Sequence, residues 1–296
     1  MKLFGSILTV GSLCGAMGCG NGSHTTVTVP QTFELRFHAV SGAQDVNCAQ
    51  ALTNMGTGHV TAHLQDLALF IHGLTFIKED GSHIIANLDD NAFQSQNVAL
   101  LDFQDRSDSC LGSSKPTHTI LSGSIADATD IKSVQFTLGV PDALNHVDPQ
   151  SVKTPLNATN MFWSWQGGYK SLRFDIAPDG GITRPTDPNF SGTNFFFHLG
   201  STDCSGDPIA GETVRCQRMN QPLIKLGAFD LSSEINIDIA ALLNELNLNV
   251  DRSDSPGCMS SQLDTECQSF FAKLGLDLNS GNPATGLSQS VFSLKK

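Results

Sequence analysis

The sequence predicts a mainly β protein: a β-sandwich-like single domain with two short C-terminal helices, stapled by disulfides. Three observations support this fold class. Short runs rich in Phe and Val are separated by turn residues, and apolar periodicity of helical length is scarce. Six cysteines lie in the part of the chain that follows the N-terminal leader. Many short strands with turns between them are typical of a sandwich or a barrel.

The strands follow from the apolar pattern. Residues 33–40 alternate apolar and polar side chains, as a half-buried strand does. Residues 67–77 predict one long strand or a strand pair, and Glu-Asp-Gly-Ser at 79–82 supplies the turn. Further strands are predicted at residues 98–103, 119–125, 134–138, 174–176, 195–199 and 223–229.

Two helices are predicted close to the C-terminus, at residues 237–246 and 262–274, where apolar residues recur at helical spacing. Neither an internal repeat nor a linker divides the chain, so residues 32–296 are interpreted as one domain. The tail after residue 276 is rich in Asn, Ser and Gly, and we expect it to be loose.

The N-terminus predicts export. Lys2, an apolar run at residues 3–10 and small residues before Cys19 describe a signal peptide over residues 1–18. Gly18-Cys19 fits lipoprotein processing, in which Cys19 is acylated; cleavage nearby by an ordinary signal peptidase is the alternative. Residues 19–31 predict a flexible spacer. We therefore expect the protein in the periplasm or outer cell envelope, in contact with a membrane only through a lipid anchor.

Export places the cysteines in an oxidising compartment, where disulfides can form. An even number of them in an oxidising compartment favours three disulfides. A zinc–thiolate cluster is the rival, and it lacks any Cys-x-x-Cys pair. Sequence alone does not choose among the pairings, but the short loops are cheapest to close, which favours Cys204–Cys216 and Cys258–Cys267 and leaves Cys48–Cys110.

The formal charge of −12 excludes one class of partner. Removing Lys2 with the signal peptide leaves 16 basic and 29 acidic residues, or −13. Without a basic stripe the chain is expected to repel nucleic acid. An acidic body weakly favours cations nearby.

Four segments are denser in chemically specific residues than a generic β domain requires. Both tryptophans and the only tyrosine fall in the second of them. The segments are residues 137–148 with Leu144-Asn145-His146 and Asp148, 155–173 with Met161, Trp163, Trp165 and Tyr169, 197–204 with His198, and 257–267 with Cys258.

Together with Ala-Leu-Leu-Asp-Phe at residues 99–103, these blocks resemble the MbnP-like periplasmic copper-binding proteins, also called metallo-mystery pair four-Cys proteins. The resemblance runs in order from about residue 33 to residue 276. It implies a copper-binding protein for uptake, buffering or delivery, without catalytic turnover. It also implies a partner, a di-haem cytochrome c peroxidase-like (MbnH-like) protein, that oxidises a tryptophan to kynurenine beside the copper. The chain departs from the family pattern at Asp203, where glycine is expected.

The resemblance also implies the ligands. His146 and His198 stand in its Leu-Asn-His and His-Leu-Gly-Ser blocks, and related copper proteins use two histidines plus kynurenine at the metal. Copper accepts imidazole nitrogen, and thioether sulfur suits its cuprous form. His38, on the first predicted strand, is a third candidate ligand, although solvent exposure is as good an interpretation.

Around these ligands, Trp163 and Trp165 are both candidates for the modification, and Met161 is a soft donor near them. Asn145, Asp148 or Ser201 could orient an imidazole from behind, although Asn145 and Asp148 could equally shape a turn. The remaining histidines are interpreted as surface or spacer residues.

Two other function classes remain open. A metal-free surface or recognition lipoprotein would use the Trp-Trp-Tyr patch to contact sugar or protein. A hydrolase or oxidase would need a general base such as Asp142 or Asp148 beside His146. Because the sequence has no Gly-x-Ser-x-Gly elbow, no His-Glu-x-x-His motif and no phosphate loop, we do not expect an enzyme.

Overall fold

The computed structural model describes residues 30–164, 166–252 and 255–295. The predicted signal peptide, the lipidation site Cys19 and Trp165 lie outside these residues. No helix in the described part is long and apolar enough to cross a membrane.

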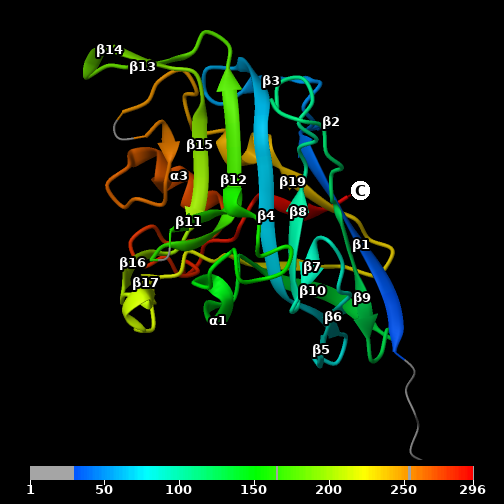
Figure 1. Cartoon of the computed structure of the whole chain (residues 1–296). Helices are drawn as coiled ribbons and strands as arrows, with labels where there is room; N and C mark the ends of the chain where they lie inside the picture. Colours follow the sequence, from blue (N-terminus) through cyan, green and yellow to red (C-terminus); the bar gives the residue numbers. More distant parts are fainter. Residues whose placement is uncertain (1–29, 165, 253–254, 296) are drawn as a thin grey trace, which may run out of the picture.

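The larger of two main sheets is built around β4 (Val60–Lys78), a 19-residue strand that runs its whole height (Figure 1). Its strand order is β18 (Leu223–Gly227), β10 (Ile131–Leu138), β4, β12 (Gly168–Pro178), β15 (Phe195–Gly200) and β20 (Gly257–Cys258). Pairing is antiparallel except between β15 and β20. Shorter strands flank this path: β3 (Ala51–Met55), β5 (His83–Ile85) and β8 (Val98–Asp102) on β4, β7 (Gln94–Ser95) on β8, and β11 (Phe162–Ser164) on β12.

The second main sheet contains both the first and the last strand. Its order is β21 (Phe292–Leu294), β19 (Ile235–Asp238), β1 (Gln31–Ser41), β9 (Ile120–Ile125) and β6 (Asn87–Leu88), with β2 (Gln44–Asp45) on β1. β1 and β19 are parallel. Two hairpins stand apart: β13 (Ile182–Arg184) with β14 (Asp187–Gly192), and β16 (Thr202–Ser205) with β17 (Arg215–Arg218).

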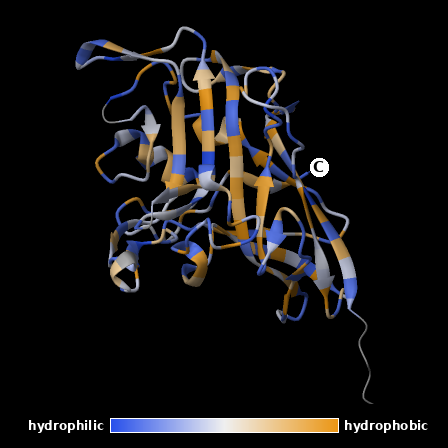
Figure 2. Cartoon of the chain, viewed as in Figure 1, coloured by the Kyte–Doolittle hydropathy of each residue, from blue (hydrophilic) through white to orange (hydrophobic). Residues whose placement is uncertain are grey.

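The main core lies between the two sheets. Alternate residues of β1 point inward, so Phe33 meets Phe76 edge-on at 5.2 Å between ring centroids and Phe37 meets Phe136 at 5.7 Å. β4 and β12 show the same alternation, as bands of hydrophobic and hydrophilic residues in Figure 2. Two stacked mixed sheets with few helices confirm the predicted sandwich-like, mainly β fold.

A smaller apolar cluster covers part of the opposite face of the large sheet, under the loops that follow β10. It contains Ala68, Phe70, Val98, Leu100, Val140, Leu156, Met161 and Tyr169. Because both faces of β4 are therefore covered, polar side chains on this outer face are buried as well. This position is where the candidate site lies.

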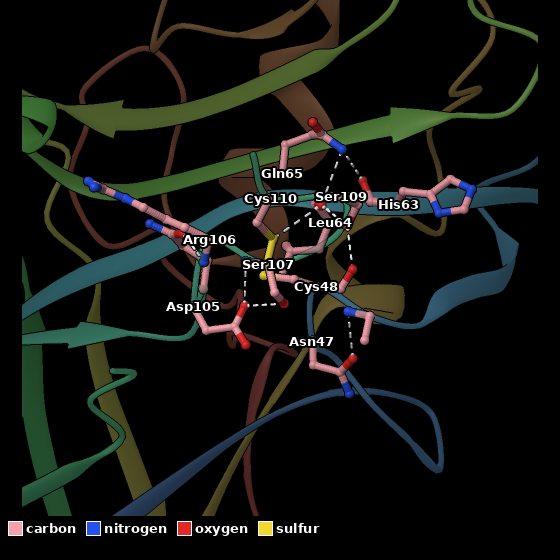
Figure 3. Close-up of a disulfide and its surroundings, with 12 residues drawn as sticks. Asn47, Cys48, His63, Leu64, Gln65, Asp105, Arg106, Ser107, Ser109 and Cys110 are labelled. Atoms are coloured by element: carbon pink, nitrogen blue, oxygen red, sulfur yellow. Dashed lines mark hydrogen bonds between the residues drawn. A yellow bond between two sulfur atoms is a disulfide. The ribbon is translucent and has the colours of Figure 1, made fainter. Parts of the chain in front are cut away.

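The three disulfides pair as the loop lengths favoured: Cys48–Cys110, Cys204–Cys216 and Cys258–Cys267. Figure 3 shows the first, whose loop is held down by the Ser109 hydroxyl, within 2.7 Å of the Cys48 carbonyl and 2.6 Å of the Leu64 carbonyl. Cys258–Cys267 joins β20 to α3 (Thr265–Lys273). The long Cys48–Cys110 link and the two local links thus fasten different parts of the fold.

Both C-terminal helices are present, with one boundary corrected. Ile237 and Asp238 extend β19, and α2 (Ile239–Leu243) begins only after Asp238, whose side chain caps the helix by accepting from the Ala241 amide. The prediction of a loose tail was wrong. Val291 and Phe292 are buried, Leu278 and Leu294 pack against the same core, and β21 completes the second sheet, because these apolar side chains dock a tail whose other residues are mostly polar.

Candidate metal centre

His198 sits on a strand whose neighbours are core residues. Phe195, Phe197 and Leu199 of β15 point into the main core, so His198 points to the opposite face, where the outer loops bury it to 7% exposure. Its cross-strand neighbour on β12 is Arg173. A polar ring is thus fixed inside a covered face of the sheet.

One nitrogen of this ring is satisfied and the other is not. Nε2 lies 2.7 Å from Oδ1 of Asp175, whereas Nδ1 is buried and has no hydrogen-bond partner among the described residues. A buried polar atom without a partner costs free energy unless a ligand, an ion or water meets it. Nδ1 is therefore the atom at which something can bind.

Electrostatics define the protonation state of the pair. Burial lowers the pKa of His198, against the hydrogen bond and the charge of Asp175. Burial acts to raise the pKa of Asp175, but the hydrogen bond from His198 and the charge of Arg173 outweigh it and leave that pKa below its usual value. A neutral imidazole facing a carboxylate donates from Nε2, so the lone pair lies on Nδ1.

Trp163 lies beside this ring. Its strand β11 pairs with β12, and the centroids of the Trp163 and His198 rings are 6.5 Å apart with the planes tilted by 47°. The indole is half-buried and lines a cavity of about 410 Å³, open to solvent, together with Asp148, Phe162 and Ser164. An indole edge is therefore both close to the imidazole and accessible from outside.

His146 reaches the same region from α1 (Asp142–Asn145), which it follows directly. The buried Asn145 side chain accepts from the Tyr169 amide at 3.0 Å and lies 3.2 Å from the Ser201 hydroxyl and 3.3 Å from Nε2 of His146. Cys216 Sγ is 3.5 Å from that same Nε2. The Asn145–Ser201 contact joins the end of α1 to the chain just beyond His198, and α1, β11 and the β16–β17 hairpin gather at one end of the large sheet (Figure 1).

The other predicted site residues lie elsewhere. Met161 is fully buried in the smaller apolar cluster, and His38 stands on β1 of the second sheet, where Nε2 meets Glu234 at 3.1 Å and Lys295 at 3.4 Å. Tyr169 is buried beside Met161, so it is absent from any exposed aromatic patch. The structure thus brings together His198, Trp163 and the His146 segment, and separates His38 from them.

Within the described residues, no three or more His, Cys, Asp or Glu side chains form a group able to hold a metal ion. Two imidazoles would need a further donor of another kind. The residue that stands beside His198 is a tryptophan, whose intact indole offers no good donor atom.

Sequence reasoning missed Asp175, the partner of His198. The available signal was the Arg173-x-Asp175 pair, which alternates with Leu172, Phe174 and Ile176 and so places two charges on one face of a buried strand. Asp203 stands where the resemblance predicts glycine, and the backbone conformation shows why. This residue has φ +54°, a left-handed conformation that favours glycine, and its carboxylate lies 3.9 Å from Arg218.

These features define a class of protein: a disulfide-stapled β-sandwich that presents a carboxylate-bound imidazole and an indole at one end of its larger sheet. A family model named MbnP matches residues 30–260, and the chain belongs to the MbnP family. The structure is similar to that of MbnP from Methylosinus trichosporium, with a TM-score of 0.81 and 26% identity over 90% of this chain and 98% of that one. A comparison with curated proteins gave no match.

Proposed function

We propose that this protein binds copper outside the cytoplasm, for uptake, buffering or delivery, and has no catalytic turnover of its own. The observation that carries the proposal is the buried Nδ1 atom of His198, which has no hydrogen-bond partner in the described residues and lies beside the half-buried Trp163. Membership of the MbnP family and the match to MbnP of Methylosinus trichosporium support it.

The residues present fit a copper ion. Nδ1 of His198 would be one ligand, because a carboxylate behind the opposite nitrogen is the usual support of a metal-bound imidazole. His146 would be the second, held by the contact of Asn145 with Ser201. Imidazole nitrogens suit both oxidation states of copper.

The third donor in this proposal is made from a tryptophan. The indole C2–C3 bond breaks and each of the two carbons receives one oxygen atom, a four-electron oxidation. The di-haem partner would draw the oxygen and the oxidising equivalents from two molecules of hydrogen peroxide, which leave as two waters. One further water then hydrolyses the N-formyl group, formate departs, and kynurenine remains with an aromatic amine as ligand.

Either Trp163 or Trp165 would be the residue that is modified. Trp163 has the cavity and the His198 contact in its favour, because a haem protein needs an accessible ring from which to withdraw electrons. Export by residues 1–18 and a lipid on Cys19 are part of the same proposal, since the partner and the disulfides both belong to an oxidising compartment.

The test is a copper titration of protein exported with and without the di-haem partner. We expect a mass gain of about 4 Da on the peptide with Trp163 and Trp165 only when the partner is present. Copper binding should then be lost in His198→Ala and weakened at least about tenfold in His146→Ala.

The control variant is His63→Ala. His63 lies near the start of β4, and its partly exposed side chain pairs with Asp179. His38→Ala should also keep the parent affinity, because its ring is engaged with Glu234 in the second sheet. Unchanged copper affinity in His198→Ala, with the protein folded, would overturn the proposal. Failure to bind any copper after partner treatment would favour a metal-free recognition role instead.

A further inference from the structure

A row of charged side chains lies buried on the outer face of the large sheet. Asp175 on β12 is opposite Asp66 on β4, and Arg173 on β12 is opposite His198 on β15. Because paired residues and residues two apart share a face, all four side chains point to the same side, away from the main core. The row therefore crosses three strands and ends at His198.

Arg173 is at the centre of this row. Its Nε and Nη2 atoms donate to one oxygen of Asp175, Oδ2, at 2.9 and 2.7 Å. Its Nη1 atom lies 3.2 Å from Oδ2 of Asp66. The Asp175 and Asp66 side chains are only 3% and 10% exposed, and that of Arg173 is 25% exposed. One guanidinium thus compensates two buried carboxylates.

The surrounding charges are balanced. Lys170 is buried in the same region and donates to the Asn160 carbonyl at 2.8 Å, and Lys115 pairs with the buried Asp102. Three cationic and three anionic side chains, with the neutral His198, therefore face one another across this part of the sheet. Among the described residues, Arg173 is the cation that pairs directly with Asp175, whereas Lys170 acts on it only through its charge at longer range.

We infer that Arg173 is a positioning residue for His198: by occupying Oδ2 of Asp175 it reserves Oδ1 for Nε2 of the imidazole and so presents Nδ1 to the site. This inference rests on the proposed copper site and deepens it. The action is indirect, since Arg173 touches neither the imidazole nor Trp163 in the contacts of the described residues.

A carboxylate held by a single partner can rotate and offer either oxygen, and the imidazole ring could then turn so that Nδ1 became the donor. Two charge-assisted N–H bonds from Arg173 converge on Oδ2 of Asp175, and together with the imidazole bond to Oδ1 they hold the carboxylate in one orientation. Asp66 pairs with Nη1, the third nitrogen of the guanidinium, and so anchors Arg173. Asp66 also lines a solvent-open cavity of about 340 Å³ with Gln104 and Arg106. The tautomer of His198 is therefore set by a residue one strand away and by its anchor two strands away.

The experiment compares Arg173→Gln and Arg173→Lys with the parent protein. The first readout is the nitrogen NMR shifts of the His198 ring in metal-free protein, which report which nitrogen carries the proton. We expect a single Nε2–H form in the parent, a mixture of both tautomers in Arg173→Gln and an intermediate result in Arg173→Lys. The second readout is copper affinity after partner treatment, expected to fall about tenfold or more in Arg173→Gln.

Arg184→Gln is the matched control. Arg184, on the separate β13–β14 hairpin, donates from the same two atoms, Nε and Nη2, to Oδ2 of the buried Asp251 at 2.8 and 2.5 Å. Loss of the Arg184–Asp251 pair should change the free energy of unfolding by about as much as Arg173→Gln does, without changing the His198 ring shifts. Circular dichroism verifies that each variant is folded. If Arg173→Gln does not fold, Arg173→Lys still provides the test.

A pure Nε2–H form in both Arg173 variants would overturn the inference. So would equal tautomer changes in Arg184→Gln. If the parent protein binds no copper, the proposed function fails, but the ring shifts in metal-free protein still decide whether Arg173 positions His198.

Discussion

Gly200 lies directly against the indole of Trp163. A Cβ atom added to Gly200 would stand 2.5 Å from Cζ3 of that ring and 3.1 Å from its Cε3. The strand that carries His198 thus ends in a residue whose missing side chain makes room for the tryptophan. The position of the indole depends on this space.

Gly200→Ala is therefore expected to displace the Trp163 ring and to cost about 1–3 kcal/mol of unfolding free energy through overpacking. The displaced indole should give a changed fluorescence maximum in a Trp165→Phe background, and a lower yield of modified peptide after partner treatment. Gly227→Ala is the control, because Gly227 also lies in a strand and nothing lies within 4 Å of its added Cβ. Equal spectra for the two variants would contradict the prediction.

Asp175→Asn should destabilise the fold by about 3 kcal/mol, since it removes one partner of a buried ion pair and leaves Arg173 undercompensated. Urea denaturation at neutral pH measures the difference. Asp179→Asn, in an exposed pair with His63, is the matched change and should shift stability by less than about 1 kcal/mol. A similar cost for both variants would show that the row around Arg173 is not energetically special.

The pH dependence of stability should reveal Asp66. Burial raises its pKa from 3.8 to about 6, although the charge of Arg173 opposes this. The folded state therefore binds more protons than the unfolded state between about pH 4 and pH 6, so this group's contribution falls as pH rises through that window, by up to about 3 kcal/mol. Asp66→Asn should remove the loss and be more stable than the parent at pH 7.

The control for that titration has the opposite sign. The pKa of Asp127 is lowered to about 2, first by the hydrogen bond from Lys78, so its contribution is present above the unfolded pKa and is lost as pH falls toward 2. The stability of Asp127→Asn should therefore fall furthest below that of the parent protein at neutral pH. Matching profiles for Asp66→Asn and Asp127→Asn would refute the assignment.

Two of the disulfides should separate stability from metal affinity. The chain-entropy model gives about 4 kcal/mol for the loop closed by Cys48–Cys110 and about 3 kcal/mol for that of Cys204–Cys216, whose separations are 62 and 12 residues. Replacing Cys48 and Cys110 by Ala should lower Tm more. Replacing Cys204 and Cys216 should instead weaken copper binding, because Cys216 Sγ packs 3.5 Å from His146.

Much of the fold was accessible from the sequence because strand alternation reports burial directly. β1, β8, β9, β15 and β18 were predicted within a few residues. β12 was predicted only at residues 174–176, since the first part of the strand, with the buried Lys170 and Ser171, shows no alternation of apolar and polar side chains, and loops cover that face too. Burial by distant loops leaves no periodic signal.

The candidate site was accessible only in part for the same reason. His146 and His198 were named from the resemblance, but nothing local to His198 indicates Asp175, which lies 23 residues away and meets it from the neighbouring strand β12. His38 shows the reverse. Its alternating strand was predicted correctly, yet a strand pattern does not say which of two sheets the strand joins.

The parallel pairing of β1 with β19, closed by β21, has a consequence for biogenesis. β1 can pair with β2 and β9 early, but its parallel neighbour β19 is synthesised only after most of the polypeptide, and the other edge of β19 stays unpaired until Phe292 docks. Such sequence-distant pairings slow folding. We therefore expect this side of the second sheet to remain open until these last strands emerge, a state suited to threading through a secretion channel and vulnerable to proteases wherever passage is delayed.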